Sequence, residues 1–232
     1  MYDCSVPSPA GYLRSTEGTM AIEPSDLTAR LSQAIKSYEA GWKPVDSELY
    51  GLCGRRSRQN DFADVYTKVA MIGRVYEAGV ARAWRGDGDP ETEVTRVLIE
   101  QADLIRTGLR RLQECRFDRQ TAGAVVELHG HIARAVSHRS GGVFLTSFVS
   151  KYLHFHCPIV PIYDSNAQDA IGELVDWEQV DPIREAMAKL PEWARAYRNF
   201  VAAFVVLHEQ AYAKTSLKPT VKELDHLLWQ PR

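Results

Sequence analysis

The sequence predicts an all-α fold, and three features of the chain support this. Apolar residues recur at the three- and four-residue spacing of a helix along most of the 232 residues. Glycine, proline and capping residues stand at the ends of these segments. No segment alternates convincingly between apolar and polar residues, and CPIVPIY (157–163) is the one short extended piece. We therefore expect one compact multi-helix domain over 23–232, built as a single unit or as two interlocked helical lobes.

The beginning of the chain and the composition indicate the class of protein. Residues 1–22 lack periodicity and are interrupted by prolines and glycines, which predicts an extended or disordered arm. This stretch also lacks the pattern of a signal peptide, and no apolar run is long enough to cross a membrane. The four cysteines lie far apart, which predicts free thiols. We expect a cytoplasmic monomer that contacts no membrane and needs no cofactor.

Capping residues define the first three predicted helices. The first, 25–41, begins with SDLT and stops at a glycine. The second, 60–86, begins with NDF and carries a broad apolar stripe, so we expect a long core helix. The third, 89–115, opens with Asp89 before Pro90, a cap followed by the residue that favours the first helical position.

The rest of the chain reads as further helices. The fourth is expected to be interrupted at Gly130, and the glycines Gly141 and Gly142 then break the chain. The helices predicted after the third cover residues 118–138, 143–155, 165–175, 182–190, 191–213 and 219–229.

The helix at 143–155 is expected to be buried, because apolar residues surround nearly its whole circumference. Its exceptions lie at i, i+3, i+4 and i+7 and form one polar stripe: Ser147, Ser150, Lys151 and His154. Desolvating an ammonium costs several kcal/mol, so a buried lysine is rarely unpaired. Lys151 is therefore expected to have an anion or water within reach.

The chain after this helix delivers an aspartate to the start of the next one. Its two prolines keep HCPIVPIYDS extended. Ser165 and Gln168 have the spacing of a capping box, so we expect Ser165 to cap the next helix. Asp164 would then lie ionised one position outside that helix. The alternative is that Asp164 is itself the cap, or is the structural partner of Lys151.

This segment resembles a known family. A buried helix, a connector with proline and an aspartate at the next helix start (PIYDSNA) resemble the catalytic segment of the helix-hairpin-helix DNA glycosylase superfamily, in particular 8-oxoguanine DNA glycosylase-like proteins. VYTKVAMIGRVY and TVKELDHLLW also look like helices of glycosylase-like bacterial proteins. The resemblance implies a similar helical fold and an enzyme that flips a nucleotide out of DNA and excises a damaged or modified base.

The resemblance also implies roles for residues. Asp164 would stabilise the oxocarbenium-like transition state of N-glycosidic bond hydrolysis. We expect Lys151 to be catalytic beside it. The side chains expected to line the pocket for the flipped base are Ser147, Ser150, Tyr152, His154, His156 and Tyr163.

Two features differ from the pattern of that family. The L-P-G-x-G hairpin is absent and HRSGGVF lies in the comparable place, so DNA-backbone contacts are expected at Arg55, Arg56, Arg58, Arg139, Gly141 and Gly142. The lysine of the family's Schiff-base members lies about eighteen residues before the aspartate, whereas Lys151 lies thirteen before Asp164. Either the connector is shorter and the helix shifted, or Lys151 binds phosphate or base and lyase activity is lacking.

The histidines suggest a zinc site as a second hypothesis. His129, His131, His154, His156 and Cys157 are all of zinc-ligand type. Residues i and i+2 of a helix point in nearly opposite directions, so neither H-x-H pair can chelate a metal from a regular helix. We expect no metal site, with one of His129 and His131 on the surface and the other in the core.

A helical module without catalysis, which binds nucleic acid or protein and keeps a glycosylase-like fold, is the third hypothesis. The net charge of −2 limits nucleic-acid contact to local arginine patches at 54–58 and 106–119, which are more often solvated helix faces. An open cleft that contains Asp164 and the polar stripe would favour the enzyme. A closed ion pair of Asp164 would favour the module.

Overall fold

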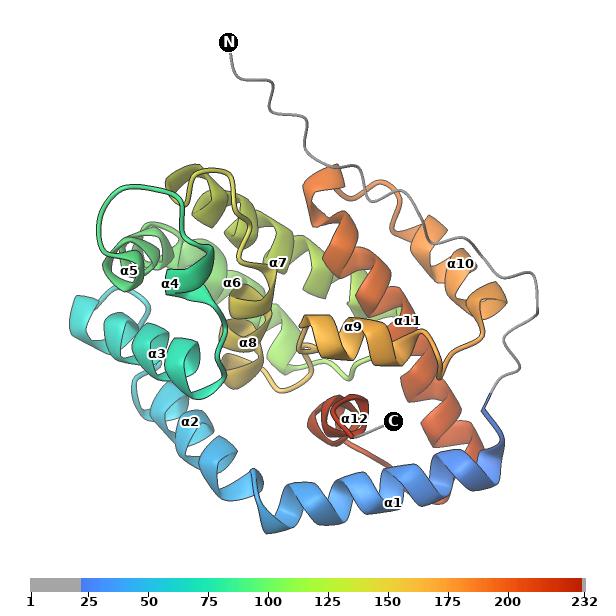
Figure 1. The fold of residues 1–232 in the computed structure, drawn as a ribbon. Coiled ribbons are helices and arrows are strands. Elements are labelled where there is room, and N and C mark those ends of the chain that lie inside the picture. Colours follow the sequence, from blue (N-terminus) through green and yellow to red (C-terminus); the bar gives the residue numbers. More distant parts are fainter. Residues whose placement is uncertain (1–21, 231–232) are drawn as a thin grey trace.

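The computed structural model describes residues 22–230, which form twelve α-helices and one short 3₁₀ helix (Figure 1). No strand occurs among these residues, so the all-α prediction is confirmed. The predicted N-terminal arm, except for residue 22, lies outside the described residues.

The first six helices cover the N-terminal half of the described chain. Their bounds are α1 (Pro24–Ala40), α2 (Lys43–Arg55), α3 (Phe62–Val75), α4 (Val80–Ala83), α5 (Pro90–Glu100) and α6 (Ala102–Gln113). The remaining elements are α7 (Arg119–Arg139), α8 (Thr146–His156), α9 (Ser165–Ile171), α10 (Trp177–Ala186), η1 (Glu192–Ala194), α11 (Arg195–Lys214) and α12 (Val221–Leu228).

Two of the predicted helices are in fact pairs of helices. The helix expected at 60–86 breaks between α3 and α4, where Glu77 and Gly79 have φ angles of 46° and 70°. A left-handed backbone cannot continue a right-handed helix, so α4 starts in a new direction. The helix expected at 89–115 likewise divides at Gln101, which ends α5 and begins α6. Apolar periodicity continues across both breaks, which is why the sequence did not reveal them.

Three further predictions of elements were wrong in detail. Helix α2 was not predicted, although it buries Leu49 and Cys53. Helix α10 begins five residues earlier than expected, because Asp176 caps it and Pro182 is tolerated inside it. Helix α7 is continuous at Gly130, where a β-carbon would approach that of Ala194 to 3.0 Å. Glycine is therefore used there for close packing against η1 and not for a break.

One continuous apolar cluster holds the helices together. Helix α11 lies at its centre and is buried on almost every face, with Val201, Phe204 and Leu207 fully enclosed. Each such side chain stabilises the fold by about 1.5–3 kcal/mol relative to exposure. In Figure 1, α12 is seen end-on between α1 and α9, and it packs against both. The two ends of the described chain therefore meet.

The loop before α5 positions the turn between α7 and α8. The Arg85 amide donates to the Ser140 carbonyl at 3.2 Å. A β-carbon on Gly86 would lie 1.9 Å from the Arg139 carbonyl oxygen, so only glycine allows this approach. The contact fixes the turn that contains Gly141 and Gly142, which leads directly into α8. No helix among residues 22–230 is both long and apolar enough to span a bilayer.

Candidate active site

Helix α8 starts from an unusual residue and is buried over its whole length. Leu145 precedes it with a φ of 44°, and no side chain caps its first amides. Every residue from Phe148 to Phe155 is buried, as the sequence predicted. In the predicted polar stripe, Ser150, Lys151 and His154 are at most 3% exposed. The stripe therefore faces other protein groups.

The Lys151 ammonium contacts groups from three elements. It donates to the Ser147 hydroxyl at 3.1 Å, one turn earlier in α8, and to the Tyr76 carbonyl at 3.3 Å, at the end of α3. It also lies 3.8 Å from Oδ2 of Asp164. The expectation that this buried lysine has an anion or water within reach is confirmed, because the carboxylate of Asp164 lies there.

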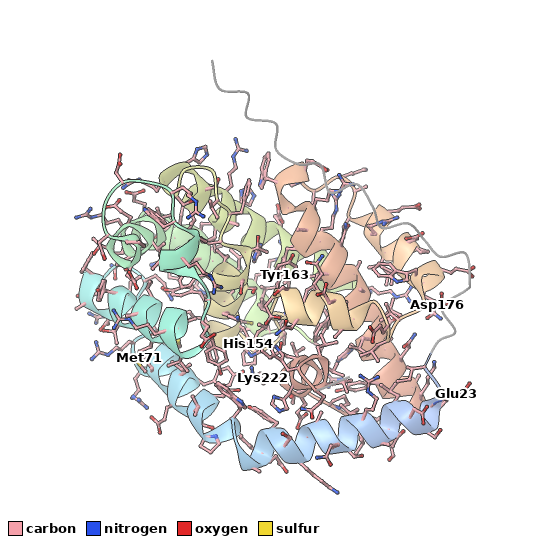
Figure 2. The ribbon with its side chains drawn as sticks, in the orientation of Figure 1. Glu23, Met71, His154, Tyr163, Asp176 and Lys222 are labelled. Carbon is pink, nitrogen blue, oxygen red and sulfur yellow. The ribbon has the colours of Figure 1, made fainter. Side chains whose placement is uncertain are left out.

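The connector between α8 and α9 folds back along α8 and so returns Asp164 to Lys151. His154 donates from Nδ1 to the Val160 carbonyl at 2.7 Å, and the Tyr163 amide donates to the Ser150 hydroxyl at 2.9 Å. These two hydrogen bonds provide partners for backbone groups of the connector, which has no helix or sheet to pair them. In Figure 2, His154 and Tyr163 lie near the middle of the molecule, whereas Asp176 lies toward its edge.

Asp164, and not Ser165, caps α9. The Ala167 amide donates to Oδ1 of Asp164 at 2.8 Å, and Ser165 is exposed as the first helical residue. The prediction of a Ser165 cap was wrong, because Asp164 adopts the extended backbone of a capping residue, with φ −154° and ψ 176°. Oδ2 of Asp164 makes no hydrogen bond to a described residue and faces Lys151. The two oxygens thus have different surroundings.

Burial shifts both members of the pair toward their neutral forms. Burial lowers the pKa of Lys151 below its ordinary value, and nearby Asp164 acts in the opposite direction. Burial raises the pKa of Asp164, opposed by the Ala167 hydrogen bond and by Lys151. Opposite shifts of neighbouring groups lower the cost of moving a proton between them and occur often at functional sites.

A cavity of about 320 Å³ lies between α4 and the start of α8, and neither Lys151 nor Asp164 is among its lining residues. We call it the α4–α8 cavity, and it is lined by Ala78, Gly79, Arg82, Ala83, Val143, Phe144, Leu145, Thr146, Ser147 and Tyr163. Ser147 is hydrogen-bonded to Lys151, and Tyr163 directly precedes Asp164. The volume lies at the lower end of the range for small-molecule sites.

The structure brings together only part of the predicted base pocket. Ser147 and Tyr163 line the α4–α8 cavity. Tyr152 and His154 are fully buried and are used inside the protein, where Tyr152 donates to Gln59 and His154 contacts Tyr50. Ser150 holds the connector, and His156 lines a second cavity, which the end of α8 forms with α2 and α6.

The predicted DNA-backbone residues form two separate groups. Arg55, Arg56 and Arg58 lie exposed at the end of α2, where Arg56 pairs with Asp64 at 2.8 Å. Arg139, Gly141 and Gly142 lie at the turn between α7 and α8. Arg139 is paired with Glu93 at 3.0 Å and Glu100 at 2.6 Å, so its charge is largely neutralised.

Sequence reasoning missed a second buried ion cluster close to the pair. Lys222 of α12 lies 2.9 Å from Oδ2 of Asp225 and 3.5 Å from Oδ2 of Asp46, which is fully buried in α2. Burial acts to lower the pKa of Lys222, but Asp225 and Asp46 outweigh it and raise that pKa. The ammonium also lies 5.1 Å from the ring centroid of Tyr76, whose carbonyl accepts from Lys151. The spacing of Lys222 and Asp225 signalled a pair on one helix face, but Asp46 lies in a helix that was not predicted.

The fold and the site together define an all-helical protein with a buried lysine–aspartate pair beside a small cavity. Among residues 22–230, no three His, Cys, Asp or Glu side chains are placed to hold a metal ion. His129 is buried and donates to the Thr146 carbonyl, whereas His131 is exposed. No family model, curated protein or solved structure matches the chain.

Proposed function

We propose that the chain is a DNA N-glycosylase that excises a damaged or modified base, with Asp164 and Lys151 at the reacting sugar. The observation that carries this proposal is that Oδ2 of Asp164 accepts no hydrogen bond from a described residue. Oδ1 is used by the helix cap, whereas Oδ2 keeps its lone pairs and lies 3.8 Å from the Lys151 ammonium. A carboxylate oxygen in a dry site stabilises a developing oxocarbenium ion.

The chemical step needs no group beyond the chain, the nucleotide and water. The bond between C1′ and the base nitrogen breaks, and its electron pair leaves with the base. Oδ2 of Asp164 stabilises the positive charge on the sugar, and a water oxygen forms the new bond to C1′ while its proton passes to solvent or to the base. Lys151 holds the carboxylate in place and orients the nucleotide through Ser147.

The α4–α8 cavity is the proposed place for the flipped base. Its wall combines the rings of Phe144 and Tyr163 with the hydroxyl of Ser147 and the guanidinium of Arg82. Aromatic faces stack on a flipped base, and a few donors read its edge. The turn at Gly141 and Gly142, which the Gly86 contact fixes, lies at the same end of α8 and is the proposed place for the DNA backbone.

The test of this proposal is base release by Asp164→Asn. The protein is incubated with duplex and single-stranded DNA that carries a panel of altered bases, and abasic sites are scored with and without alkali. We expect the wild type to release at least one base and Asp164→Asn to lose about a thousandfold in rate, as when a charge-stabilising group is removed. Asparagine caps a helix as well as aspartate does, but it also leaves Lys151 without its anion, so circular dichroism and urea unfolding check that Asp164→Asn is folded under the assay conditions.

Asp176→Asn is the matched control, because Asp176 caps α10 through the Glu178 amide but lies outside both cavities. It should keep the wild-type rate. Base release by Asp164→Asn at the wild-type rate would remove Asp164 from the mechanism. Strand scission without alkali would show lyase activity, and loss of that scission in Lys151→Ala would assign it to Lys151.

One observation favours the second candidate, a helical module that binds nucleic acid without catalysis. Lys151 is 3% and Asp164 8% exposed, so the ion pair is closed to a nucleotide in this conformation. A module would retain DNA in a gel-shift experiment and release no base from any substrate of the panel. Its DNA affinity would be the same in Asp164→Asn and in Asp176→Asn.

A further inference from the structure

A second cavity, of about 590 Å³, lies between α2, α6 and the end of α8. We call it the α2–α6 cavity, and it is lined by Tyr50, Cys53, Gly54, Ser57, Gln59, Arg106, Leu109, Arg110, Gln113, Phe155, His156 and Pro158. It shares no residue with the α4–α8 cavity. Its volume is well within the range of cofactor and substrate sites.

The charge of this cavity favours an anion. Arg106 and Arg110 lie one turn apart on α6 and therefore on one face of that helix, and no carboxylate is among the lining residues. Arg106 has an exposed partner in Asp103 at 2.8 Å, an ion pair that holds an arginine only weakly. Arg110 has no carboxylate within ion-pair distance among the described residues. Two arginines on one face match the geometry of a phosphate group.

Behind the lining residue Gln59, a fixed polar network adds positive charge. The buried Lys68 ammonium donates to the carbonyls of Arg56 and Arg58 and to Oε1 of Gln59, which are all neutral acceptors. Burial lowers the pKa of Lys68 to about 8, so it is mostly charged at neutral pH. Tyr152 also donates to Oε1 of Gln59, which fixes the orientation of this amide.

The fixed amide determines the tautomer of His156. The Gln59 amide nitrogen lies 3.2 Å from Nε2 of His156 and can only donate, so Nε2 must accept. The ring proton is then on Nδ1. Burial, and then the Lys68 charge, lower the pKa of His156 to about 3, so the ring is neutral at pH 7. Burial raises the pKa of Cys53 to about 11, so its thiol is a neutral part of the wall.

The remaining wall suits a flat ligand with a hydrogen-bonding edge. Tyr50 and Phe155 contribute aromatic rings whose centroids lie 5.0 Å apart. The second hydrogen of the Gln59 amide, the Gln113 amide and the Ser57 hydroxyl provide donors and acceptors. Nucleobases are planar, have donor and acceptor edges, and carry a phosphate through a sugar.

We propose that the α2–α6 cavity is a nucleotide-binding site, in which Arg106 and Arg110 bind the phosphate and the Gln59 amide contacts a base held against Tyr50 and Phe155. This site is independent of the glycosylase proposal, because it uses neither Lys151 nor Asp164. The same chemistry fits a free nucleoside monophosphate and one nucleotide of a single strand.

The sharpest test fills the cavity without disturbing the core. Gly54 lines the cavity near the end of α2, and a β-carbon there meets no atom within 4 Å. Gly54→Phe is expected to fold and to occupy the binding space. Gly123→Phe on α7 is the matched control, because a β-carbon at Gly123 also meets no atom and Gly123 lines neither cavity. A second comparison uses two double variants, Arg106→Ala/Arg110→Ala in the cavity and Arg111→Ala/Arg116→Ala as its control. All four arginines are exposed.

The probes are the four 5′-deoxynucleoside monophosphates, their nucleosides, inorganic phosphate and a short single-stranded oligodeoxynucleotide. Isothermal titration calorimetry measures the binding of each probe to the protein. We expect at least one monophosphate to bind at one site per chain, about tenfold tighter than its nucleoside or phosphate alone. Gly54→Phe and the Arg106/Arg110 variant should each weaken it about tenfold or more, and both controls should bind like the wild type.

The two sources of the nucleotide give different results. An oligodeoxynucleotide that binds tighter than every monophosphate, and is weakened by the same variants, identifies a strand as the ligand. The reverse order identifies a free nucleotide. Absence of saturable binding at millimolar concentration, or unchanged binding by Gly54→Phe, would overturn the proposal. Asp164→Asn should bind nucleotide normally, so failure of the glycosylase proposal leaves this result unaffected.

Discussion

Asp164 uses its two carboxylate oxygens for different contacts, and this division explains why the residue is needed for the fold as well as for the proposed chemistry. Oδ1 accepts a hydrogen bond from the Ala167 amide, which has no backbone partner because it lies in the first turn of α9. Oδ2 lies near the Lys151 ammonium, which has otherwise only neutral partners in Ser147 and the Tyr76 carbonyl. A buried ammonium with no anion is costly, so the pair constrains both helices.

At the residue scale, we predict that Asp164→Ala is far more destabilising than Asp176→Ala. Asp176 caps α10 in a more accessible position and forms no ion pair with a described residue, so its loss should cost about 1 kcal/mol. Asp164→Ala removes a cap and also leaves Lys151 buried without an anion, which should cost about 3–5 kcal/mol. Urea unfolding followed by circular dichroism measures both. Equal losses would show that the ion pair contributes nothing beyond the cap.

At the element scale, α8 and its connector form one unit. His154 and Ser150 hold the connector against α8, and the connector in turn returns Asp164 to Lys151. Residues thirteen apart can thus meet at 3.8 Å, because the chain reverses after a helix of eleven residues. The thirteen-residue spacing, which differs from that of the glycosylase family, therefore does not keep the Lys151 ammonium and the Asp164 carboxylate apart.

The turn that begins this unit gives the second stability prediction. Gly86→Ala should destabilise the protein by about 1–3 kcal/mol, because the added methyl would lie 1.9 Å from the Arg139 carbonyl and force the backbone to move. Gly123→Ala, in open space on α7, should instead stabilise the protein by about 0.5–1 kcal/mol through helix propensity. Differential scanning calorimetry distinguishes them. A Gly86→Ala protein as stable as wild type would mean that the loop before α5 can move away from the turn after α7 at no cost in stability.

At the scale of the whole molecule, neutral buried histidines make stability depend on pH. His129, at 1% exposure, donates to the Thr146 carbonyl and stacks on Tyr197. Burial lowers the pKa of His129 to about 4, although the Thr146 bond acts in the other direction. Burial also lowers the pKa of His154 to about 3. The unfolded chain binds these protons near pH 6.5, so stability is present above that pH and falls as the pH decreases toward 4.

We predict that the stability gap between wild type and His129→Gln narrows as the pH falls from 6.5 to 4. The wild type loses up to about 1.4 kcal/mol per pH unit through His129, and glutamine loses none. Comparing the two proteins at each pH cancels the opposite contribution of Asp46 and Asp164, whose pKa values burial raises. Urea unfolding over this pH range measures the gap. A constant gap would mean that His129 is protonated equally in both states.

Much of the fold and part of the site could be predicted from the sequence. The cap at Asp89 was predicted and is confirmed, and the helix expected to begin in NDF is capped by Asp61, because capping depends on a side chain and the amides three residues later. The break between α3 and α4 was not predicted, because apolar periodicity continues across it and the left-handed φ at Glu77 falls on a residue type that rarely adopts it. The division of the predicted base-pocket residues between cavities and core could not be foreseen either, because neighbours on α8 face different elements.

The sequence alone determined the helical class, the burial of α8 and the need of Lys151 for an anion or water, because periodicity and desolvation act through neighbours along the chain. Only the tertiary structure decided that Asp164 is this anion and caps α9, and that His156 faces a separate, arginine-lined cavity. These contacts join residues from different helices, and their distances follow from how the helices pack against one another. The direction in which a connector reverses, and hence the partners of each buried charge, is settled by that packing.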